Sequence, residues 1–341
     1  MTQSYSQEPP RGGTSSPSID PDGGRQPAVG MPKAHDSFRH QGFLFRGDDA
    51  FLAGTVPFIH RALQAEQPVM VAVTSTHLKL LRSTIGTDAG QVHYLDMAKV
   101  GGNPAQIIPA WRDFIQDHGA EGQPMCGVAE PIGPGRRPAE VRECQLHEAL
   151  LNFAIEPHTP LWLLCTYDVE TLAPDIITEA HRTHPVMVEN QDHQPSTLYS
   201  GWHHVETVFE TDLPTFAGAA AHQAFGRENL QALREDVSSH ALRAGVSPAR
   251  ASDLALAVYE VAVNSVKHGS VERVLRIWVE PGTLVCEIHD HGHVTDPMVG
   301  RMRPARDDEK GRGLWIANHL CDLVQLRSGP GGTTVRIHTW L

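Results

Sequence analysis

The sequence lacks the features that mark membrane and secreted proteins. No apolar run approaches the roughly 18 residues that a membrane-spanning helix needs, and the N-terminal residues lack the apolar core of a secretory signal. The five cysteines are scattered and form no C-x-x-C pair, which indicates buried, reduced thiols. Positive charge is also scarce, because 28 Lys and Arg against 40 Asp and Glu leave a net charge of −12. We therefore expect a cytoplasmic protein that neither spans a membrane nor binds nucleic acid over a broad surface.

The composition is that of a folded protein with more than one domain. The chain has 341 residues, of which 40% are hydrophobic and 20% charged, and this length favours two or three domains. Residues 1–33 are rich in Gly, Pro, Ser and Gln, which predicts a disordered tail. We place a first domain at 34–190, a linker at 191–204 and a second domain at 205–341.

In the first domain, short apolar runs alternate with helical patterns. The predicted strands are 42–45, 69–73, 92–95, 125–128 and 161–165. The predicted helices lie near 48–65, 76–85, 104–118, 138–154 and 169–183. This alternation predicts an α/β domain with a mostly parallel sheet and helices on both faces. Neither G-x-G-x-x-G nor G-x-x-x-x-G-K-[ST] is present, so no phosphate-binding loop is predicted here.

The second domain has a different order of elements. After a connector near 185–204, with an edge strand predicted at 197–199, we expect a strand at 205–211 and long helices near 220–243 and 247–268. Strands at 271–280 and 283–290, a helix near 313–321, and strands at 323–327 and 333–339 follow. Grouped helices and adjacent strands predict an α+β layer with an antiparallel or mixed sheet.

One helix of the second domain carries a polar stripe beside its apolar face. We expect it to begin after Ser252 as N-cap and to stop at Gly269. The positions predicted to face the sheet are Leu254, Val258, Val261 and Ser265. Glu260, Asn264 and His268 recur at i, i+4 and i+8 beside that face. A carboxamide oxygen with waters and phosphates is a common way to hold Mg²⁺, although helix contacts alone could also close such a stripe.

Three later segments favour a nucleotide site. Asp290 ends a strand two residues before Gly292, a pattern that can accept an exocyclic amine beneath a ring but also occurs in ordinary turns. Gly311 and Gly313 precede a helix whose free N–H groups attract phosphate, or they belong to a flexible loop. Thr333 and Thr334 begin the last strand after two glycines, either beside a ring or in a hairpin turn.

In this order and spacing, the segments resemble the ATP-binding domain shared by gyrase, Hsp90, histidine kinases and MutL. Within that GHKL superfamily, residues 205–341 look most like the anti-sigma-factor serine kinases of bacteria. The resemblance implies a Bergerat-type two-layer α+β sandwich that binds ATP and Mg²⁺. One departure is that Val294 stands where the family often has a second glycine after Asp290.

The resemblance also implies roles for individual residues. Asn264 would coordinate Mg²⁺, and Glu260 would be the general base. Asp290 would bind the adenine amino group, with a water linked to Thr334. The remaining motif positions would line the nucleotide: Gly292 below the base, Gly311 and Gly313 in the lid, Thr333 on the last strand, and His268 as a phosphate or packing contact.

The first domain carries its own polar residues. Glu130 and Asp168 follow buried strands, where the ends of parallel strands form a ligand crevice. His147 and Glu148 are helix neighbours that diverge by ~100°, so that this pair is poorly placed to share a metal. H-E-x-x-H is not matched, because Leu151 stands at its last position. These polar residues could instead cap and brace the sheet.

Residues 35–190 resemble the MEDS sensory domain. The match rests on the opening His40, Asn103-Pro104, Ile108-Pro109-Ala110-Trp111, Glu130-Pro131, His147 to Asn152, Leu164-Cys165, Tyr167-Asp168 and His184-Pro185. Phe45 stands where relatives often have a tyrosine. The resemblance implies that the domain senses an unknown small molecule, with His40, Glu130, His147 and Asp168 as candidate sensory residues.

Together the two resemblances predict a bacterial regulator in which a signal at the first domain shifts the second through the connector. Its output would be capture of a sigma factor, phosphorylation of Ser or Thr on an anti-anti-sigma partner, or both, in stress-response transcription. One alternative is a cytosolic sensor histidine kinase with His203 or His204 as phosphoacceptor. Another is a catalytically inactive, partner-binding regulator. A homodimer is compatible with either output.

Overall fold

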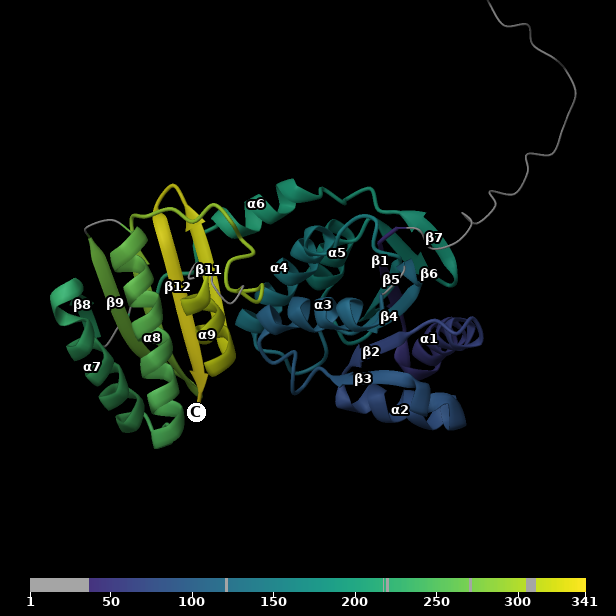
Figure 1. Ribbon diagram of the computed structural model, residues 1–341, viewed down its shortest axis with the longest axis horizontal. Coiled ribbons are helices and arrows are strands. Elements are labelled where there is room, and N and C mark those ends of the chain that lie inside the picture. Colours follow the sequence, from purple (N-terminus) through teal and green to yellow (C-terminus); the bar gives the residue numbers. More distant parts are fainter. Residues whose placement is uncertain (1–36, 120–121, 217, 219–220, 270–271, 305–310) are drawn as a thin grey trace, which may run out of the picture. The chain divides into compact units, whose positions relative to one another are not determined.

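The computed structural model describes residues 37–119, 122–216, 218, 221–269, 272–304 and 311–341 (Figure 1). The tail predicted at 1–33 lies outside this described part. Among the described helices, none is both long enough and apolar enough to cross a membrane.

A seven-stranded sheet forms the first half. Its strands are β1 Arg39–Phe45, β2 Val69–Val73, β3 Val92–Asp96, β4 Met125–Ala129, β5 Leu161–Asp168, β6 Val186–Glu189 and β7 Asp192–Pro195, in the order β3-β2-β4-β5-β1-β6-β7. All neighbours pair in parallel except β7, which is antiparallel to β6. The five predicted strands and the mostly parallel sheet are confirmed.

Helices cover both faces of this sheet. They are α1 Gly47–Gln64, α2 Ser75–Ile85, α3 Ile107–His118, α4 Pro138–Ala154 and α5 Pro174–Thr183, with 3-10 turns η1 Gly86–Gln91 and η2 Pro104–Gln106. Along β2, Val71 packs in one core cluster with Phe51 of α1, whereas Met70 packs in the other with Trp111 of α3. Because successive side chains of a strand point to opposite faces, a strand buried on both sides is apolar throughout.

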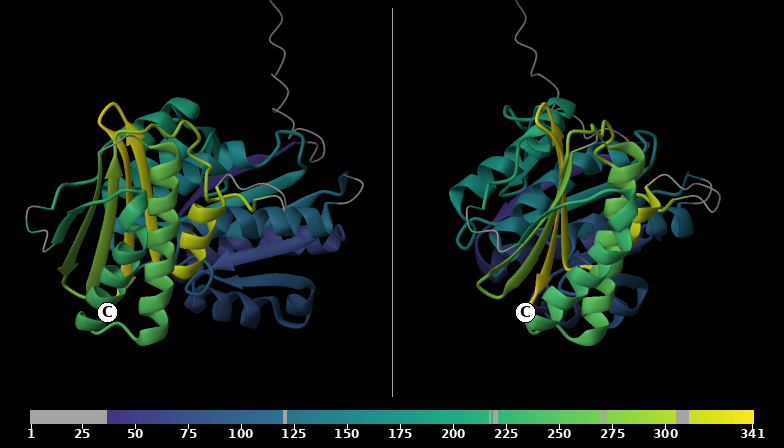
Figure 2. Two further views of the ribbon diagram at one scale, coloured as in Figure 1. Left: turned by 60° about the vertical axis from the view of Figure 1, so that its left-hand side comes forward. Right: turned by 90° about the vertical axis from the view of Figure 1, so that its left-hand side faces the viewer.

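A five-stranded antiparallel sheet forms the second half. Its elements are α6 Trp202–Glu210, β8 Ala221–Ala224, η4 Arg227–Asn229, α7 Leu230–Arg243, α8 Pro248–His268, β9 Arg273–Glu280, β10 Thr283–Asp290, α9 Arg312–Leu320, β11 Leu323–Gly329 and β12 Gly332–Trp340. The strand order is β11-β12-β10-β9-β8. Helices α7, α8 and α9 form a layer on one face (Figure 2), which confirms the two-layer α+β sandwich.

Four local predictions were wrong. Residues 205–211 lie mostly in helix α6, because Val205 and Phe209 are buried one helical turn apart. The long helix expected from 220 begins only at Leu230, after the short strand β8. The edge strand is β7 rather than 197–199, so part of the expected linker completes the first sheet. Helix α8 occupies the predicted range, but its N-cap is Ser247 rather than Ser252, with Pro248 in its first turn.

Candidate functional site

Helix α8 is the element around which the candidate nucleotide site is built. Its four predicted sheet-facing residues are all buried: Leu254, Val258, Val261 and Ser265. Glu260 and Asn264 lie beside them and are half-buried, whereas His268 in the last turn is exposed. The polar stripe therefore runs along the border between the core and the surface, where side chains can reach a ligand without leaving the helix's packed face.

Asp290, at the end of β10, is tied to α8 and to the following turn. Its Oδ2 accepts a hydrogen bond of 2.5 Å from Ser265 Oγ, and its Oδ1 accepts one of 2.6 Å from the Gly292 backbone N–H. The side chain is almost fully buried. Each carboxylate oxygen can accept a second bond, so Asp290 is held in one orientation and can still accept a donor from a ligand.

Two glycines allow the chain to pass close to Asp290. A Cβ on Gly269, which follows α8, would lie 2.6 Å from Asp290 Cγ. A Cβ on Gly292 would lie 2.6 Å from Asp290 Oδ1 and 2.7 Å from the Cα of Gly269. All three distances are shorter than real Cβ contacts, so a side chain does not fit at either position. Gly269 was predicted only as a helix stop, and its φ of −81° shows that it is not a left-handed cap.

The glycines before α9 bring a third segment to α8. Gly311 adopts a left-handed φ of 75° as N-cap of α9, a conformation that favours glycine. A Cβ on Gly313 would lie 2.7 Å from Asn264 Nδ2 and 3.3 Å from Glu260 Cβ. The start of α9, with backbone N–H groups that have no partner within the helix, therefore lies directly against the polar stripe.

The two threonines of the last strand, Thr333 and Thr334, lie on opposite faces of the sheet. Thr333 pairs with Asp290 across β10 and β12, and its Oγ1 donates to the Gly292 carbonyl at 2.9 Å. Thr334 lies on the opposite face, where its hydroxyl is 3.0 Å from His289 Nδ1. The structure thus brings Thr333 to the turn below Asp290 and does not bring Thr334 there, because neighbouring residues of a strand point to opposite faces.

Val294, the departure from the glycine pattern, is anchored to the sheet. Its backbone N–H donates to Ser328 Oγ at 2.8 Å, and the same hydroxyl lies 3.2 Å from His293 Nδ1. The Val294 side chain packs against the core. The turn after Gly292 is therefore fixed to β11 rather than left open.

In the first domain, Glu130 belongs to a hydrogen-bonded cluster at the ends of parallel strands. Its Oε2 accepts bonds from the backbone N–H and the hydroxyl of Thr74, at 2.9 and 2.7 Å, and lies 2.9 Å from His77 Nδ1. Asp48 is 3.4 Å from the other ring nitrogen of His77. Burial lowers the pKa of His77, but bonding to Glu130 and Asp48 outweighs it, so the pKa lies above its ordinary value.

The other predicted sensory residues separate into two groups. Asp168 accepts from the Glu170 N–H and the Thr171 hydroxyl, so it braces its own turn. His40 and His147 both lie within 3.4 Å of Glu148 in the domain interior. Sequence reasoning missed His77 and His184, because only the fold brings them to Glu130 and Glu148.

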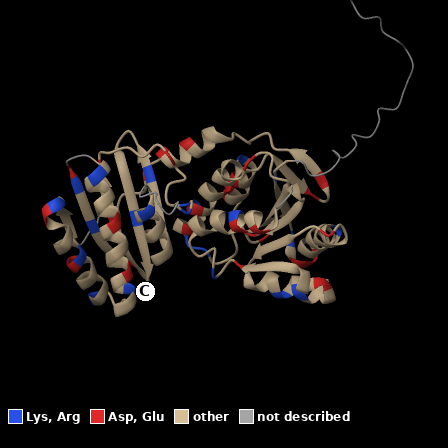
Figure 3. Cartoon of the chain, in the orientation of Figure 1, with Lys and Arg blue, Asp and Glu red and all other residues tan. Residues whose placement is uncertain are grey.

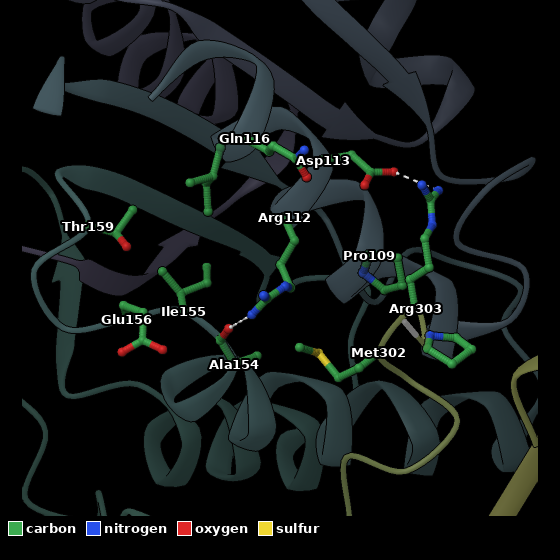
Figure 4. Close-up of a pocket in the computed structure, with 12 residues that line it drawn as sticks. Pro109, Arg112, Asp113, Gln116, Ala154, Ile155, Glu156, Thr159, Met302 and Arg303 are labelled. Atoms are coloured by element: carbon green, nitrogen blue, oxygen red, sulfur yellow. Dashed lines mark hydrogen bonds and ion pairs between the residues drawn. The ribbon is translucent and has the colours of Figure 1, made fainter. Parts of the chain in front are cut away.

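A cavity of about 580 Å³ lies away from all these residues (Figure 4). It is bordered by α3, the end of α4 and the segment Met302–Pro304. Arg112 crosses it to the Ala154 carbonyl at 2.9 Å, and Arg303 lies 3.3 Å from Asp113 at its rim. None of the predicted sensory residues lines it.

Comparisons with known proteins agree with both halves of the fold. Residues 39–185 match the family of the MEDS domain, described as "MEthanogen/methylotroph, DcmR Sensory domain". Residues 226–339 match the family described as "Histidine kinase-like ATPase domain". No curated protein matches the chain.

Among solved structures, one similar chain holds the RsbU and RsbW domains of Rv1364c from Mycobacterium tuberculosis. It is 18% identical over the aligned part, with a TM-score of 0.28. The alignment covers 36% of this chain and 33% of the other, so about a third of that protein is represented.

Proposed function

We propose that this chain, in which a MEDS domain is joined to a histidine kinase-like ATPase domain, is a bacterial signal-dependent regulator. Its second domain binds ATP with Mg²⁺, and its output is the control of a sigma factor. The regulator acts by binding the sigma factor, by phosphorylating Ser or Thr on an anti-anti-sigma partner, or by both. The proposal rests on the two family matches and on the arrangement around α8.

One observation carries the proposal: the end of β10 and the start of α9, distant in sequence, meet along one turn and a half of α8. Asp290 reaches α8 at Ser265, the start of α9 reaches it at Asn264, and Thr333 holds the turn that follows Asp290. A polar stripe closed only by helix contacts would not require glycines at each approach. This arrangement leaves a carboxylate, a carboxamide and a helix N-terminus around one region, which suits adenine, a metal ion and phosphate respectively.

The residues present suit ATP and Mg²⁺. We assign the carboxamide oxygen of Asn264 to Mg²⁺, which would supply charge neutralisation to the phosphates. Asp290 receives the adenine amino group, and the Gly311–Gly313 segment receives phosphate oxygens. His268, exposed in the last turn, is proposed as a phosphate contact only.

We assign Glu260 as general base for the phosphoryl transfer. It accepts the proton of a partner's Ser or Thr hydroxyl as that oxygen bonds to the γ-phosphorus and ADP leaves. Glu260 is half-buried beside Asn264, so a partner side chain can approach it from the surface.

Direct contacts between the domains offer a route for the signal. Asn103, just before η2 in the MEDS domain, donates from Nδ2 to the backbone carbonyl and to Oδ1 of Asn318, both at 3.0 Å. Asn318 lies in α9, the helix whose start borders Asn264. We predicted that the connector would carry the coupling, and these contacts join the domains independently of it.

A buried ion-pair cluster strengthens the same interface. Glu143 of α4 lies 2.7 Å from Arg301 and 2.6 Å from Arg327 of β11. All three side chains are at most 5% exposed. Arg301 follows Gly300, whose carbonyl accepts from Asn318 Nδ2 at 2.9 Å. Helix α4 thus contacts the segment that packs on α9.

The histidine-kinase alternative requires a helical hairpin that presents a phosphoacceptor histidine. Within the described residues 185–216, α6 is the single α-helix and has nine residues. His204 in it is buried against Glu179 at 2.9 Å, whereas His203 is exposed. This stretch does not supply the hairpin, so the proposal stays with transfer to a separate protein.

Calorimetric titration of the full chain with ATP and Mg²⁺ tests nucleotide binding. We expect binding to weaken at least tenfold in Asn264→Ala, because the metal ligand is removed. Ser252→Ala, at an exposed position of the same helix, should bind like the unsubstituted chain. Equal heats of ATP binding for Asn264→Ala and Ser252→Ala would overturn the proposal that nucleotide binds at this site.

Phosphoryl transfer separates a kinase from an inactive binding protein. The full chain is incubated with γ-labelled ATP and an anti-anti-sigma protein from the same genome, and the product is analysed by mass spectrometry. We expect phosphoserine or phosphothreonine, lost in Glu260→Gln while ATP binding persists. Binding of ATP without any transfer would support the catalytically inactive regulator instead.

A further inference from the structure

The interior of the MEDS domain contains four residues of metal-ligating type that come from four elements. They are His40 of β1, Glu148 of α4, Cys165 of β5 and His184, which follows α5. One ligand atom from each lies within 4.8 Å of all the others. All four are buried, so solvent does not compete for these atoms.

The hydrogen bonding of His184 fixes which ring nitrogen faces the cluster. Its Nδ1 lies 2.8 Å from the Ala180 backbone carbonyl, which can only accept, so Nδ1 carries the proton. In a neutral ring Nε2 then bears a lone pair. This Nε2 lies 3.0 Å from Glu148 Oε2 yet has no hydrogen-bond partner of acceptable geometry.

His40 is oriented in the same way by Asn152. The Asn152 amide nitrogen donates to three backbone carbonyls, those of Glu148, Ala149 and Thr183, at 2.8 to 3.3 Å. The amide oxygen must therefore be the atom 3.0 Å from His40 Nδ1, and it accepts the proton of that nitrogen. The Nε2 lone pair of His40 consequently points inward, 3.4 Å from Glu148 Oε2 and 3.3 Å from Cys165 Sγ.

This geometry places electron-rich atoms against one another. Two imidazole nitrogens face the same carboxylate oxygen, which also accepts the Tyr167 hydroxyl at 3.2 Å. Within the described residues, no recorded ion pair joins Glu148 to a lysine or arginine. Since a buried carboxylate is costly without a cation, the cluster needs positive charge at its centre.

The spacing of the four atoms suits a tetrahedral ion. Zinc bonds of roughly 2.0–2.3 Å to N, O and S place neighbouring ligand atoms about 3.3–3.8 Å apart. The separations that involve His40 Nε2, 3.4 and 3.3 Å, already lie in this range, and the 3.0 Å between His184 and Glu148 is slightly shorter. A histidine that binds a metal through one ring nitrogen usually donates the N–H of the other to a carbonyl or carboxylate.

We propose that His40, Glu148, Cys165 and His184 bind one borderline divalent transition-metal ion, with zinc as the ion that suits all four ligand types. Asn152 and Ala180 act as positioning partners that fix the two rings. The site does not include His147, whose Nε2 lies 3.4 Å from the other carboxylate oxygen of Glu148. It is independent of the nucleotide site around α8.

The charge and proton balance of binding is simple. Zn²⁺ displaces the thiol proton of Cys165 to solvent and bonds to the thiolate, to the Glu148 carboxylate and to Nε2 of both histidines. One thiolate, one carboxylate and Zn²⁺ sum to zero charge, which removes the unpaired buried carboxylate.

Cobalt substitution of the tag-free full chain tests the site. The protein is loaded with Co²⁺, and we expect one equivalent bound, with tetrahedral visible bands and a thiolate-to-cobalt charge-transfer band. Cys165→Ser should lose the charge-transfer band. Cys126→Ser, which alters a buried strand cysteine outside the cluster, should keep it. A band that persists in Cys165→Ser, or one absent from the unsubstituted chain, would overturn the proposal.

A second measurement does not depend on any variant folding. X-ray absorption at the zinc edge of the loaded, unsubstituted chain should show one sulfur at about 2.3 Å and lighter N or O scatterers at about 2.0–2.1 Å. Zinc surrounded by N and O alone would assign the ion to surface histidines and overturn the proposal. A chain that holds no metal after loading would also overturn the proposal, because the cluster would then be a network of shared protons only.

Discussion

At the residue scale, the positions of Gly269 and Gly292 near Asp290 leave no room for a side chain. Gly269 and Gly292 lie so close together that a Cβ on Gly292 would approach the Gly269 backbone to 2.7 Å. Backbone atoms cannot move aside as the end of a flexible side chain can. The close passage lets the turn donate its N–H to Asp290 while the carboxylate also holds α8.

Gly292→Ala should therefore lower the free energy of unfolding by roughly 1–3 kcal/mol, the usual range for overpacking. Urea unfolding of the full chain measures it. Gly90→Ala is the control, because a Cβ there meets nothing within 4 Å, and it should change stability by no more than about 1 kcal/mol. Equal stability of the two variants would contradict this account of the turn.

His77 supplies a prediction about pH. Its pKa is raised above 6.5, because contacts with Glu130 and Asp48 outweigh burial. A raised folded-state pKa contributes stability that is fully present below the unfolded pKa and is lost as pH rises through the folded pKa. His77→Gln should thus be most destabilised, relative to the unsubstituted chain, below about pH 6.5.

The measurement is urea unfolding at several pH values on both sides of that range. His203→Gln, which changes an exposed histidine, controls for other titrating groups and should show no such trend. A stability difference for His77→Gln that is constant with pH would show that His77 contributes no proton-linked stability.

At the element scale, α4 is buried over its middle, where nearly all residues from Glu143 to Leu151 are inaccessible to solvent. Leu146, Leu150 and Leu151 pack in the main core, while Glu143 and Glu148 are just as buried on other sides of the helix. A helix enclosed on all sides loses the one-sided pattern of a surface helix. Its acidic residues must then find buried partners, and Glu143 finds two arginines of the second domain.

Glu143→Gln should destabilise the protein by about 3–5 kcal/mol, because Arg301 and Arg327 would remain buried without their carboxylate. The pKa of Glu143 is held below its ordinary value, since the two arginines outweigh burial. The control is Asp113→Asn, which breaks the exposed pair with Arg303 and should cost less than about 1 kcal/mol. Similar losses of unfolding free energy in the two variants would mean that burial does not determine how much these ion pairs contribute to stability.

At the scale of the whole molecule, acidic residues outnumber basic ones, and the net charge is −12. In the view of Figure 3, residues of both signs are spread over the described helices and strands. Such a surface favours protein partners over nucleic acid.

Coupling between the domains gives a prediction at this scale. Asn103→Ala removes both hydrogen bonds to Asn318 and should leave α9 less well fixed. We expect ATP to bind several-fold more weakly by calorimetry, although Asn103 belongs to the other domain. By reciprocity, ATP should then increase hydrogen-exchange protection of η2 in the unsubstituted chain. If the ATP affinity of Asn103→Ala and the hydrogen-exchange protection of η2 were both unchanged, this contact would not be coupled to the nucleotide site.

Most of the helices and strands could be predicted from local sequence patterns. The parallel strands of the first domain and the strands β10 and β12 were predicted from apolar runs, because burial on a sheet leaves a local signature. Helix α6 was mistaken for a strand, since short apolar segments have no decisive period. The spacing of the glycines and the stripe formed by Glu260 and Asn264 could also be read from the sequence.

The pairing of buried polar side chains could not be predicted in this way. The sequence cannot show that His184 joins His40 at Glu148, that Glu143 pairs with Arg301, or that Thr334 faces away from Asp290. These relations depend on strand order, on the face that each strand residue occupies, and on contacts across 100 or more residues. Local periodicity encodes burial, but partner choice among buried polar groups is settled by packing in three dimensions.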